Sequence, residues 1–391
     1  MAITAPTAKP VAAKKLAPLF YDGQEVGKSY YLGCSRGGGQ GIKAAEMFPE
    51  DFDGILAGAP AVDFDNLYSW RASFFPLTGA VGSGDFISAG VWNSTIHDEV
   101  LRQCDGIDGV LDGIIEDPTL CQFQPDALLC DGVQNTSSSS SNTACLTAAQ
   151  VQIVQDIFAD YTWPNGSLLF PAMQPGSEIL AAAGLYSGAP FPLSLDWFRF
   201  AVLEDPNWDA STYGIDDALL AAEKNPGDAR TWPSSSSLLA GFARRGGRIL
   251  TYHGLQDQQI TSYNSIRFYE HLLASSNTSS STTTQDMDQF YRFFRVPGMS
   301  HCSGGPGAWV LGQKGAAAEG IPFDAEHNLL AALVAWVEDG AAPETITGTK
   351  FVDDDAARGV AYRHRHCKYP SRSTYLGSGL DPLEELSWAC V

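Results

Sequence analysis

The sequence is short of basic side chains. Its 24 Lys and Arg residues stand against 45 Asp and Glu residues, which gives a formal net charge of −21 at pH 7. A field of that sign repels phosphate backbones and anionic membrane surfaces, so it excludes nucleic-acid binding as a leading function. The sequence also has no apolar run near the roughly 20 residues that a membrane-spanning helix needs. We therefore expect no membrane partner.

Two further absences concern export and redox chemistry. The 8 cysteines include no C-x-x-C pair, which favours disulfide bonds over a zinc or dithiol site. With sequons at Asn93, Asn135, Asn165 and Asn277, this predicts a secreted, extracellular glycoprotein. The first 20 residues have no continuous apolar segment and cannot be a signal peptide. We expect that the start of the precursor is missing. The alternative is that the chain is not exported and its thiols stay reduced.

Short apolar segments alternate with helical patterns near both ends of the chain. At 44% hydrophobic residues, the chain can form a substantial core. Residues 29–32 predict a strand, 40–48 a helix and 53–60 a second buried strand. That order is typical of a βαβ unit in a parallel sheet. Later in the chain we expect strands at 248–253 and 289–296, and helices at 263–273 and 329–338.

The middle of the chain breaks this pattern into loops and short helices, with polar tracts at 135–143, 234–237 and 275–284 that we expect to be exposed loops. An insertion into an α/β domain explains this better than a tandem domain. We therefore predict an α/β fold whose catalytic domain is discontinuous, formed by residues 1–64 and 241–391, with an inserted domain at 65–240.

A candidate nucleophile lies between the first predicted strand and helix. Gly33-Cys34-Ser35-Arg36-Gly37 is the only match to G-x-S-x-G, the nucleophile elbow of α/β-hydrolases. In such an elbow the serine occupies a strained turn that small neighbours make possible, and the following helix end stabilises a developing oxyanion. The alternative is a glycine-rich turn with an incidental serine. The position between a strand and a helix favours Ser35 as nucleophile.

An α/β-hydrolase needs an acid and then a histidine later in the chain. Asp257 follows the predicted strand at 248–253, and His301 follows the strand at 289–296. His253 is a competitor, but it precedes Asp257 and lies near a strand end, where we expect it to pack. The order Ser35, Asp257, His301 therefore indicates a catalytic triad.

The candidate nucleophile and the candidate base each have a cysteine as their neighbour in the sequence. Cys34 precedes Ser35, and Cys302 follows His301. If the two segments meet, these cysteines could form a disulfide between residues 268 positions apart. The chain-entropy model gives such a bond about 5–6 kcal/mol as an upper value. Its catalytic value would be to position the nucleophile and the base.

These residues resemble those of the tannase and feruloyl esterase family, in particular the fungal feruloyl esterase B-like serine esterases. The hallmark of that family is a Cys-Ser, Asp, His-Cys arrangement with a disulfide between the two active-site cysteines. The likeness extends from about residue 15 to the end of the chain. The matching stretches are 30–41, 51–61, 104–121, 252–260, 297–302 and 369–390.

The resemblance implies an α/β-hydrolase fold, a mainly parallel sheet with flanking helices and a large inserted lid domain. Family members usually have a long region before the nucleophile that supplies early strands. We therefore expect an N-terminally truncated chain with an exposed sheet edge. The triad implied is Ser35, Asp257 and His301. The disulfide pairs implied are Cys34–Cys302, Cys104–Cys121, Cys130–Cys145 and Cys367–Cys390.

An acidic, glycine-rich loop is a candidate metal site. Asp105, Asp108 and Asp112 lie within eight residues, and this clustering alone leaves a hard-cation site and a solvated loop both open. The family resemblance implies a structural Ca²⁺ held by these three side chains and by the carbonyl groups of Val110 and Ile114.

The predicted activity is hydrolysis of carboxylic esters through a Ser-His-Asp acyl-enzyme mechanism, in which the backbone N–H of Arg36 helps to bind the oxyanion. The resemblance implies small aromatic esters or plant cell-wall esters as substrates. We favour feruloyl and other hydroxycinnamoyl esters over the galloyl esters of a tannase, because the insert contains no dibasic processing site. An inactive, truncated relative that acts at most as a binding module is the alternative from another class.

The predicted insert is rich in aromatic residues. We expect most of them to form its core and a few to stack on a flat phenolic acyl group. They are Tyr68, Trp70, Phe74, Phe75, Trp92, Trp163, Trp197, Phe198, Phe200 and Trp208.

Overall fold

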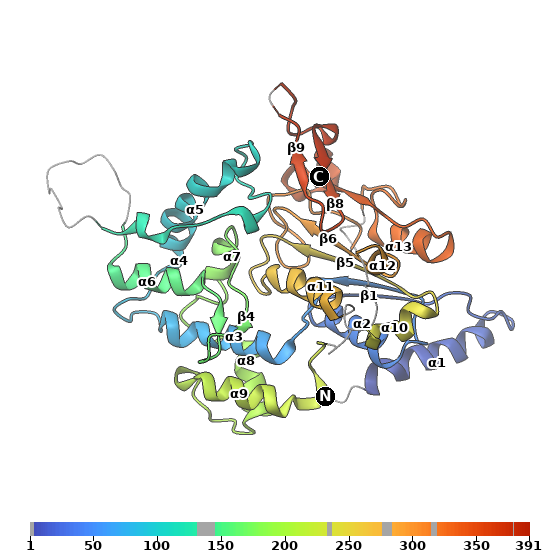
Figure 1. Cartoon of the computed structure of the whole chain (residues 1–391), viewed down its shortest axis with the longest axis horizontal. Coiled ribbons are helices and arrows are strands. Elements are labelled where there is room, and N and C mark those ends of the chain that lie inside the picture. Colours follow the sequence, from blue (N-terminus) through green and yellow to red (C-terminus); the bar gives the residue numbers. More distant parts are fainter. Residues whose placement is uncertain (1–3, 131–144, 233–236, 276–283, 314–318, 378) are drawn as a thin grey trace. The chain divides into compact units, whose positions relative to one another are not determined.

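The computed structural model describes residues 4–130, 145–232, 237–275, 284–313, 319–377 and 379–391. The chain folds into two compact units (Figure 1), which we call the sheet unit and the insert unit. The sheet unit comprises Met1–Phe64, Gly227–Gly254 and Asn264–Val391. The insert unit comprises Asp65–Pro226 and Leu255–Tyr263.

The limits of these units differ in two places from the ranges predicted from the sequence. The insert unit ends at Pro226, whereas the sequence placed its end at residue 240. It also includes Leu255–Tyr263, which the sequence placed in the catalytic domain. The polar tracts at 135–143 and 275–284 lie almost wholly outside the described residues, as do the sequons at Asn135 and Asn277.

A parallel sheet forms the centre of the sheet unit. Within the described residues it has four strands in the order β1-β2-β5-β6, and every neighbouring pair is parallel. Strands β2 and β6 are buried along their whole length, and β5 is buried except at its first residue. Such continuous burial is expected of parallel strands with both faces covered. The strands are β1 (Tyr30–Cys34), β2 (Gly54–Gly58), β5 (Arg248–Gly254) and β6 (Tyr291–Val296).

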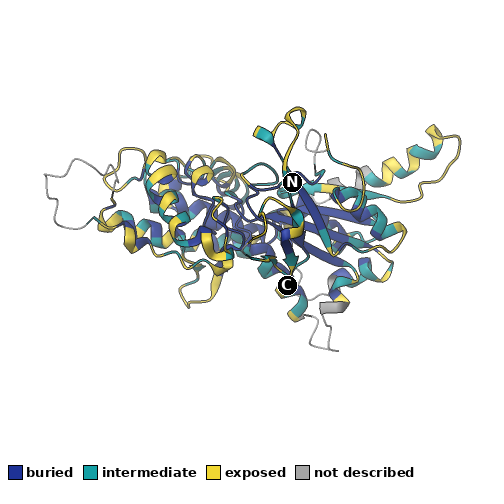
Figure 2. Ribbon diagram, turned by 90° about the horizontal axis from the view of Figure 1, so that it is seen from above, coloured by how far each residue is buried: buried dark blue, intermediate teal, exposed yellow. Residues whose placement is uncertain are grey.

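Alternate residues of these strands point into two separate cores, as the twofold period of a strand requires. Ile55 and Ile249 pack on one face with residues of α2 (Arg36–Met47), α10 (Ser237–Arg244) and α11 (Tyr263–Ser275). Figure 2 shows strands of the sheet in the dark blue of buried residues, whereas β1 is only partly buried. On the other face, Leu56, Leu250 and Phe294 pack against Leu329, Leu333 and Trp336 of α13 (Leu329–Glu338).

The strands and helices predicted for this unit correspond to β1, β2, β5, β6, α2, α11 and α13. The main difference is that α2 begins at Arg36, four residues before the predicted start at residue 40, so the glycines at 37–39 are helical. The reason is close packing. A Cβ atom on Gly38 would lie 2.5 Å from the Gly58 carbonyl oxygen, and one on Gly39 would lie 2.7 Å from that of Ala61.

Several elements of the sheet unit carry no clear signal in the sequence. Strands β7 (Thr345–Phe351) and β8 (Val360–Cys367) form an antiparallel hairpin, and β9 (Ser373–Tyr375) pairs with β10 (Trp388–Cys390). The other helices of this unit are α1 (Thr4–Phe20) and α12 (Thr284–Asp288). Across the described ranges, every helix is too short or too polar to cross a membrane.

The insert unit consists of short helices around an aromatic core. Trp70, Phe74, Trp92 and Phe198 are buried there, and Tyr186 contacts both Phe74 and Trp92. Of the ten aromatic residues noted in the sequence, these four and Tyr68 are buried and Phe200 is exposed, so half of the expected set forms the core of the insert. The elements are α3 (Phe64–Thr78), α4 (Ala89–Val91), α5 (His97–Cys104), α6 (Ala148–Ile157), β3 (Tyr161–Thr162), β4 (Leu168–Phe170), α7 (Glu178–Ala182), α8 (Pro192–Trp197) and α9 (Ile215–Lys224).

Candidate active site

Ser35 is the single residue between strand β1 and helix α2. Its backbone angles are φ 62° and ψ −125°, a conformation that costs a side-chain-bearing residue about 1–3 kcal/mol. Hydrogen bonds hold it there, because the Ser35 N–H donates to the Gly58 carbonyl oxygen at 2.9 Å and its own carbonyl accepts from Ala61 N–H at 3.0 Å. The strain that a nucleophile elbow requires is therefore present at this serine.

The residues around Ser35 explain why glycine flanks it. A Cβ atom on Gly33 would lie 2.7 Å from the carbonyl group of Gly37, so no larger residue fits at this position. The Tyr31 hydroxyl donates to the same Gly37 carbonyl oxygen at 2.9 Å. Burial raises the pKa of Tyr31, which keeps this hydroxyl protonated as a donor. Close packing at Gly33 and the hydrogen bond to the Gly37 carbonyl thus fix the turn on both sides of Ser35.

Arg36 begins helix α2, so its peptide N–H belongs to the helix end where the dipole favours negative charge. Its side chain lies elsewhere, with the guanidinium 4.0 Å from the Phe64 ring centroid and Nη1 3.4 Å from the Ala229 carbonyl oxygen. The role of the Arg36 N–H in binding an oxyanion stays a prediction.

His301 lies on a compact loop after β6, residues 297–307, which we call the His301 loop. The Ser300 N–H donates to the Gly304 carbonyl oxygen at 2.9 Å, and a Cβ atom on Gly305 would lie 2.1 Å from the Gly298 carbonyl oxygen. Gly305 also has a φ of +104°. The loop is therefore folded tightly upon its own backbone, with His301 half-buried.

A disulfide joins the serine turn to the His301 loop. Cys34 and Cys302 are bonded, with their Cα atoms 6.0 Å apart. Because consecutive Cα atoms are 3.8 Å apart, the Cα atoms of Ser35 and His301 lie within about 14 Å of each other. The prediction of disulfide bonds is confirmed, and all eight cysteines are paired. The other bonds are Cys104–Cys121, Cys130–Cys145 and Cys367–Cys390, the same pairs that the resemblance implies.

Asp257 comes three residues after the end of β5, in the segment Leu255–Tyr263, which we call the acid loop. The carboxylate is fully buried, and its Oδ1 accepts hydrogen bonds from Gln259 N–H at 2.8 Å and Ile260 N–H at 2.9 Å. His253, the competing histidine, is fully buried within β5, and its Nδ1 lies 2.7 Å from the Ser265 hydroxyl. It packs inside the sheet unit.

Two buried residues of the insert unit that no sequence motif marks contact the acid loop. Arg71 donates from Nε to the Gln259 carbonyl oxygen at 2.8 Å, and Gln174 donates from Nε2 to the Asp257 carbonyl oxygen at 2.5 Å. Both side chains come from segments distant in the sequence from residue 257. Only the tertiary structure reveals that they share a site.

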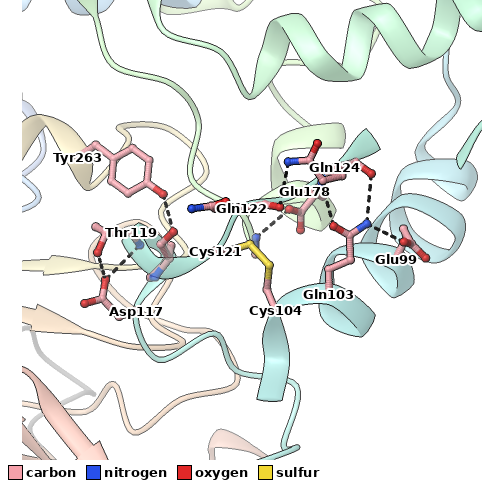
Figure 3. The surroundings of a disulfide bond; sticks show 12 residues. Glu99, Gln103, Cys104, Asp117, Thr119, Cys121, Gln122, Gln124, Glu178 and Tyr263 are labelled. Atoms are coloured by element: carbon pink, nitrogen blue, oxygen red, sulfur yellow. Dashed lines mark hydrogen bonds between the residues drawn. A yellow bond between two sulfur atoms is a disulfide. The ribbon is translucent and has the colours of Figure 1, made fainter. Parts of the chain in front are cut away.

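The acidic loop after α5 is closed by the Cys104–Cys121 disulfide (Figure 3). Each of the three candidate carboxylates accepts a hydrogen bond from a backbone N–H of the same loop. The donors are Gly113 for Asp105, Val110 for Asp108 and Ile114 for Asp112. Among the residues that the structure describes, no three His, Cys, Asp or Glu side chains converge as a metal would require. The metal ligands stay a prediction.

The electrostatics of this loop nevertheless suit a cation. Burial, and then the charges of Glu116 and Asp112, raise the pKa of Asp108 to about 6. A carboxylate whose negative neighbours disfavour its ionised form gains from a divalent cation.

The insert unit also contains a small cleft with aromatic walls. Of the aromatic residues noted in the sequence, Phe75 and Trp208 line it, together with Phe191. The remaining lining residues include Ala72, Pro190, Ser194 and Leu195. The free space in this cleft is close to that of one water molecule, which is too little for a phenolic ring.

A strained serine at the strand-to-helix turn of a parallel α/β sheet defines the class of this protein as an α/β-hydrolase. The model of the family described as "Tannase and feruloyl esterase" matches residues 6–385. The chain belongs to this family of esterases.

Individual relatives agree with that assignment. A protein named probable feruloyl esterase B-2 from Aspergillus flavus is 53% identical over 360 residues, which cover 92% of this chain and 66% of that protein. Another of that name from Aspergillus oryzae is 46% identical over 97% of this chain and 69% of its own length. The chain therefore spans about two thirds of the length of the curated relatives it matches.

Solved structures show the same fold. The crystal structure of feruloyl esterase B from Aspergillus oryzae matches 98% of this chain and 73% of that chain, with a TM-score of 0.89 and 43% identity. A tannin acyl hydrolase from Aspergillus niger matches with a TM-score of 0.70 at 20% identity, which shows likeness of fold alone. The prediction of an α/β-hydrolase fold is confirmed.

Proposed function

We propose that this chain hydrolyses esters of phenolic acids, with feruloyl and related hydroxycinnamoyl esters as its substrates. The observation that carries the proposal is Ser35 in its strained turn, tied by the Cys34–Cys302 disulfide to the loop that bears His301. This arrangement suits a serine nucleophile with a histidine base held close to it.

The proposed mechanism assigns one role to each residue. His301 removes the proton from Ser35 Oγ, which attacks the ester carbonyl carbon. The Arg36 N–H at the start of α2 donates to the developing oxyanion, and Asp257 orients the imidazole and stabilises its protonated form. His301 then gives the proton to the leaving alcohol, and water attacks the acyl-enzyme to release the phenolic acid and regenerate Ser35.

The names of the relatives support a phenolic acyl group. The relatives with 43–53% identity cited above are named feruloyl esterases.

The test is turnover of methyl ferulate and propyl gallate by the purified chain beside Ser35→Ala. We expect hydrolysis of methyl ferulate, with a fall in kcat of about four to six orders of magnitude in the variant. Faster hydrolysis of propyl gallate would reassign the chain as a tannase. Equal turnover by both proteins would refute the serine mechanism, and binding of ferulate without turnover would indicate a binding module.

We also propose that the loop closed by Cys104–Cys121 binds a structural Ca²⁺, with Asp105, Asp108 and Asp112 as the side-chain ligands and the Val110 and Ile114 carbonyls completing the set. The support is the burial of the Asp108 carboxylate beside the carboxylates of Glu116 and Asp112, which together raise its pKa. A cation bound only by the folded state stabilises that state.

Chelation tests the calcium proposal through its pH dependence. The raised pKa means that folded Asp108 holds its proton more tightly than unfolded Asp108, so without metal this group lowers stability as the pH rises from about 4 to about 6. Bound Ca²⁺ would oppose this loss. We expect a chelator to lower Tm at pH 7, to lower it less at pH 4.5, and to leave Asp108→Asn unaffected. An unchanged Tm for the native chain at pH 7 would contradict the proposal.

We infer that the protein works outside the cell. All eight cysteines are paired, and disulfides persist in oxidising compartments. The sequons at Asn93 and Asn165 are exposed, so both can accept glycans. Mass spectrometry of non-reduced peptides from the secreted protein should show Cys34 linked to Cys302, and two free thiols there would contradict the inference.

A further inference from the structure

The acid loop follows a strand of the sheet unit, yet it packs within the insert unit. Asp257, Ile260 and Ser262 are fully buried. A buried loop needs partners for its backbone N–H and carbonyl groups, since leaving them unbonded is costly. Two side chains of the insert unit, Gln174 and Arg71, supply such partners, and a third contact joins the Tyr263 hydroxyl to a backbone carbonyl.

The first contact is a bridge made by Gln174, which is fully buried. Its Nε2 donates to the Asp257 carbonyl oxygen at 2.5 Å, and its Oε1 accepts from the Ser262 N–H at 2.9 Å. A carbonyl can only accept and an N–H can only donate, so these partners fix the orientation of the amide. Nε2 also lies 2.5 Å from the Ser177 hydroxyl. One rigid amide thus joins two points of the acid loop, five residues apart.

The second contact is Arg71, whose guanidinium carbon lies 5.3 Å from the ring centroid of Tyr68 and 5.2 Å from that of Phe191. Its Nε donates to the Gln259 carbonyl oxygen at 2.8 Å. Burial lowers the pKa of Arg71, while Tyr68 and the Asp257 carboxylate raise it. A buried carboxylate needs such a countercharge to stay ionised.

The third contact lies at the far end of the acid loop. The Tyr263 hydroxyl donates to the Pro118 carbonyl oxygen at 2.9 Å, next to the Asp117–Thr119 turn and inside the loop closed by Cys104–Cys121 (Figure 3). The acid loop is therefore anchored at its start, its middle and its end by the insert unit.

We propose that Gln174 is a positioning residue for Asp257, so that the insert fixes the acid of the proposed triad. The proposal rests on the proposed function, in which Asp257 orients His301. Gln174 touches no reacting atom and acts through the conformation of the acid loop. Loss of its bridge should tilt the Asp257 carboxylate, and a displacement of about 1 Å can lower a rate by about 10².

A purely structural Gln174 would behave differently from a positioning residue. Its replacement would lower Tm but leave kcat unchanged below the melting transition. Leu169, which is fully buried in β4 of the same unit, provides the matched control. Leu169→Ala leaves a cavity in the insert and removes no hydrogen bond to the acid loop, because a leucine side chain makes none.

The experiment compares wild type, Gln174→Met and Leu169→Ala on methyl ferulate, with Tm recorded for each. We expect Gln174→Met to lower kcat by about 10- to 100-fold with KM changed less than about twofold. Leu169→Ala should lower Tm while keeping kcat within about twofold. Unchanged kcat in Gln174→Met, or an equal loss in both variants, would overturn the proposal. If Gln174→Met does not fold, Gln174→Glu keeps the size and the acceptor for Ser262 but loses the donor to Asp257.

Hydrogen exchange separates this proposal from the proposed function. The N–H groups of Gln259, Ile260 and Ser262 are bonded in the acid loop, so Gln174→Met should speed exchange of the 255–263 peptide while leaving β2 unchanged. A wild type without Ser35-dependent turnover would refute the proposed function. In that case, unchanged exchange of the 255–263 peptide in Gln174→Met would still overturn the proposed bridging role of Gln174, and faster exchange of that peptide would support it.

Discussion

The loops that follow β5 and β6 are held in place by different means. The His301 loop belongs to the sheet unit, where glycine-dependent backbone packing and the Cys34–Cys302 disulfide fix it. The acid loop belongs to the insert unit, where the Arg71 and Gln174 side chains hold its backbone. The segment of the proposed base is thus covalently joined to that of the proposed nucleophile, while the segment of the proposed acid depends on hydrogen bonds from side chains of the insert unit.

This difference separates two kinds of stability. A long-range disulfide acts mainly on the unfolded state by limiting the separation of its ends. A side-chain hydrogen bond contributes about 0.5–1.5 kcal/mol, and it is lost whenever either partner moves. We therefore expect the His301 loop to keep its conformation under conditions in which the acid loop opens.

Breaking the long disulfide should have the largest effect. In the chain-entropy model, removing Cys34–Cys302 by Cys34→Ala/Cys302→Ala lowers the free energy of unfolding by about 5–6 kcal/mol. The same model gives about 3–4 kcal/mol for Cys367–Cys390, whose partners are 23 residues apart. Urea unfolding of the sheet unit measures both double variants. An equal loss of unfolding free energy in the two double variants would mean that the sequence separation of the bonded cysteines does not govern how much each disulfide stabilises the protein.

Neighbouring glycines in the His301 loop offer a sharper test of its backbone packing. Gly304 and Gly305 both have positive φ, at +81° and +104°, but a Cβ atom on Gly304 meets nothing within 4 Å. Gly304→Ala should therefore cost only the backbone strain, about 1–2 kcal/mol. Gly305→Ala adds a clash at 2.1 Å with the Gly298 carbonyl oxygen and should cost about 3 kcal/mol or more. Equal changes in urea midpoint for the two variants would contradict this account of the loop.

The sequence predicted the sheet unit well because its signals are local. The apolar runs of β2, β5 and β6 and the G-x-S-x-G string each lie within a few adjacent residues. Ser35, Asp257 and His301 could be proposed because each follows a strand. The start of α2 was missed, since the glycines at 38 and 39 usually indicate a turn and are helical here only because they pack against β2.

The attachment of the acid loop to the insert could not be predicted. Arg71 and Gln174 reach this loop from segments distant in the sequence, through hydrogen bonds to backbone groups, and backbone partners leave no residue pattern. The end of the insert was placed at 240 rather than Pro226 because no composition change marks that boundary. Long-range contacts between irregular segments are where single-sequence reasoning fails.

A buried histidine gives the His301 loop a dependence on pH. His366 in β8 is fully buried, and its Nε2 donates to the Ala308 carbonyl oxygen, one residue beyond the loop, at 2.9 Å. Burial, and then His364, lower the pKa of His366 to about 3. Between pH 6.5 and 3 the unfolded state binds a proton there that the folded state does not, so stability falls as the pH falls.

The expected loss from this group is about 2 kcal/mol on going from pH 7 to pH 5. His366→Gln keeps a donor for the Ala308 carbonyl and removes the titrating group. Its unfolding free energy, measured in urea at pH 7, 6 and 5, should therefore fall less steeply than that of wild type. Parallel pH profiles for the two proteins would show that His366 does not govern the acid sensitivity.

The smallest effect is expected at the exposed side of the His301 loop. Lys350 in β7 donates from Nζ to the Gly305 carbonyl oxygen at 2.6 Å and to Asp354 Oδ1 at 2.7 Å. Lys350→Met should lower the free energy of unfolding by about 1 kcal/mol, because a partly exposed charged hydrogen bond contributes little. Lys224→Met removes a similar bond, to the Val202 carbonyl oxygen in the insert unit, and should not change the urea transition of the sheet unit.

If the His301 loop is held by its disulfide and its glycine packing, kcat of Lys350→Met stays within about twofold of wild type. A tenfold loss of kcat would instead show that the base, like the acid, depends on side-chain hydrogen bonds for its position, and the contrast between the two loops would be wrong.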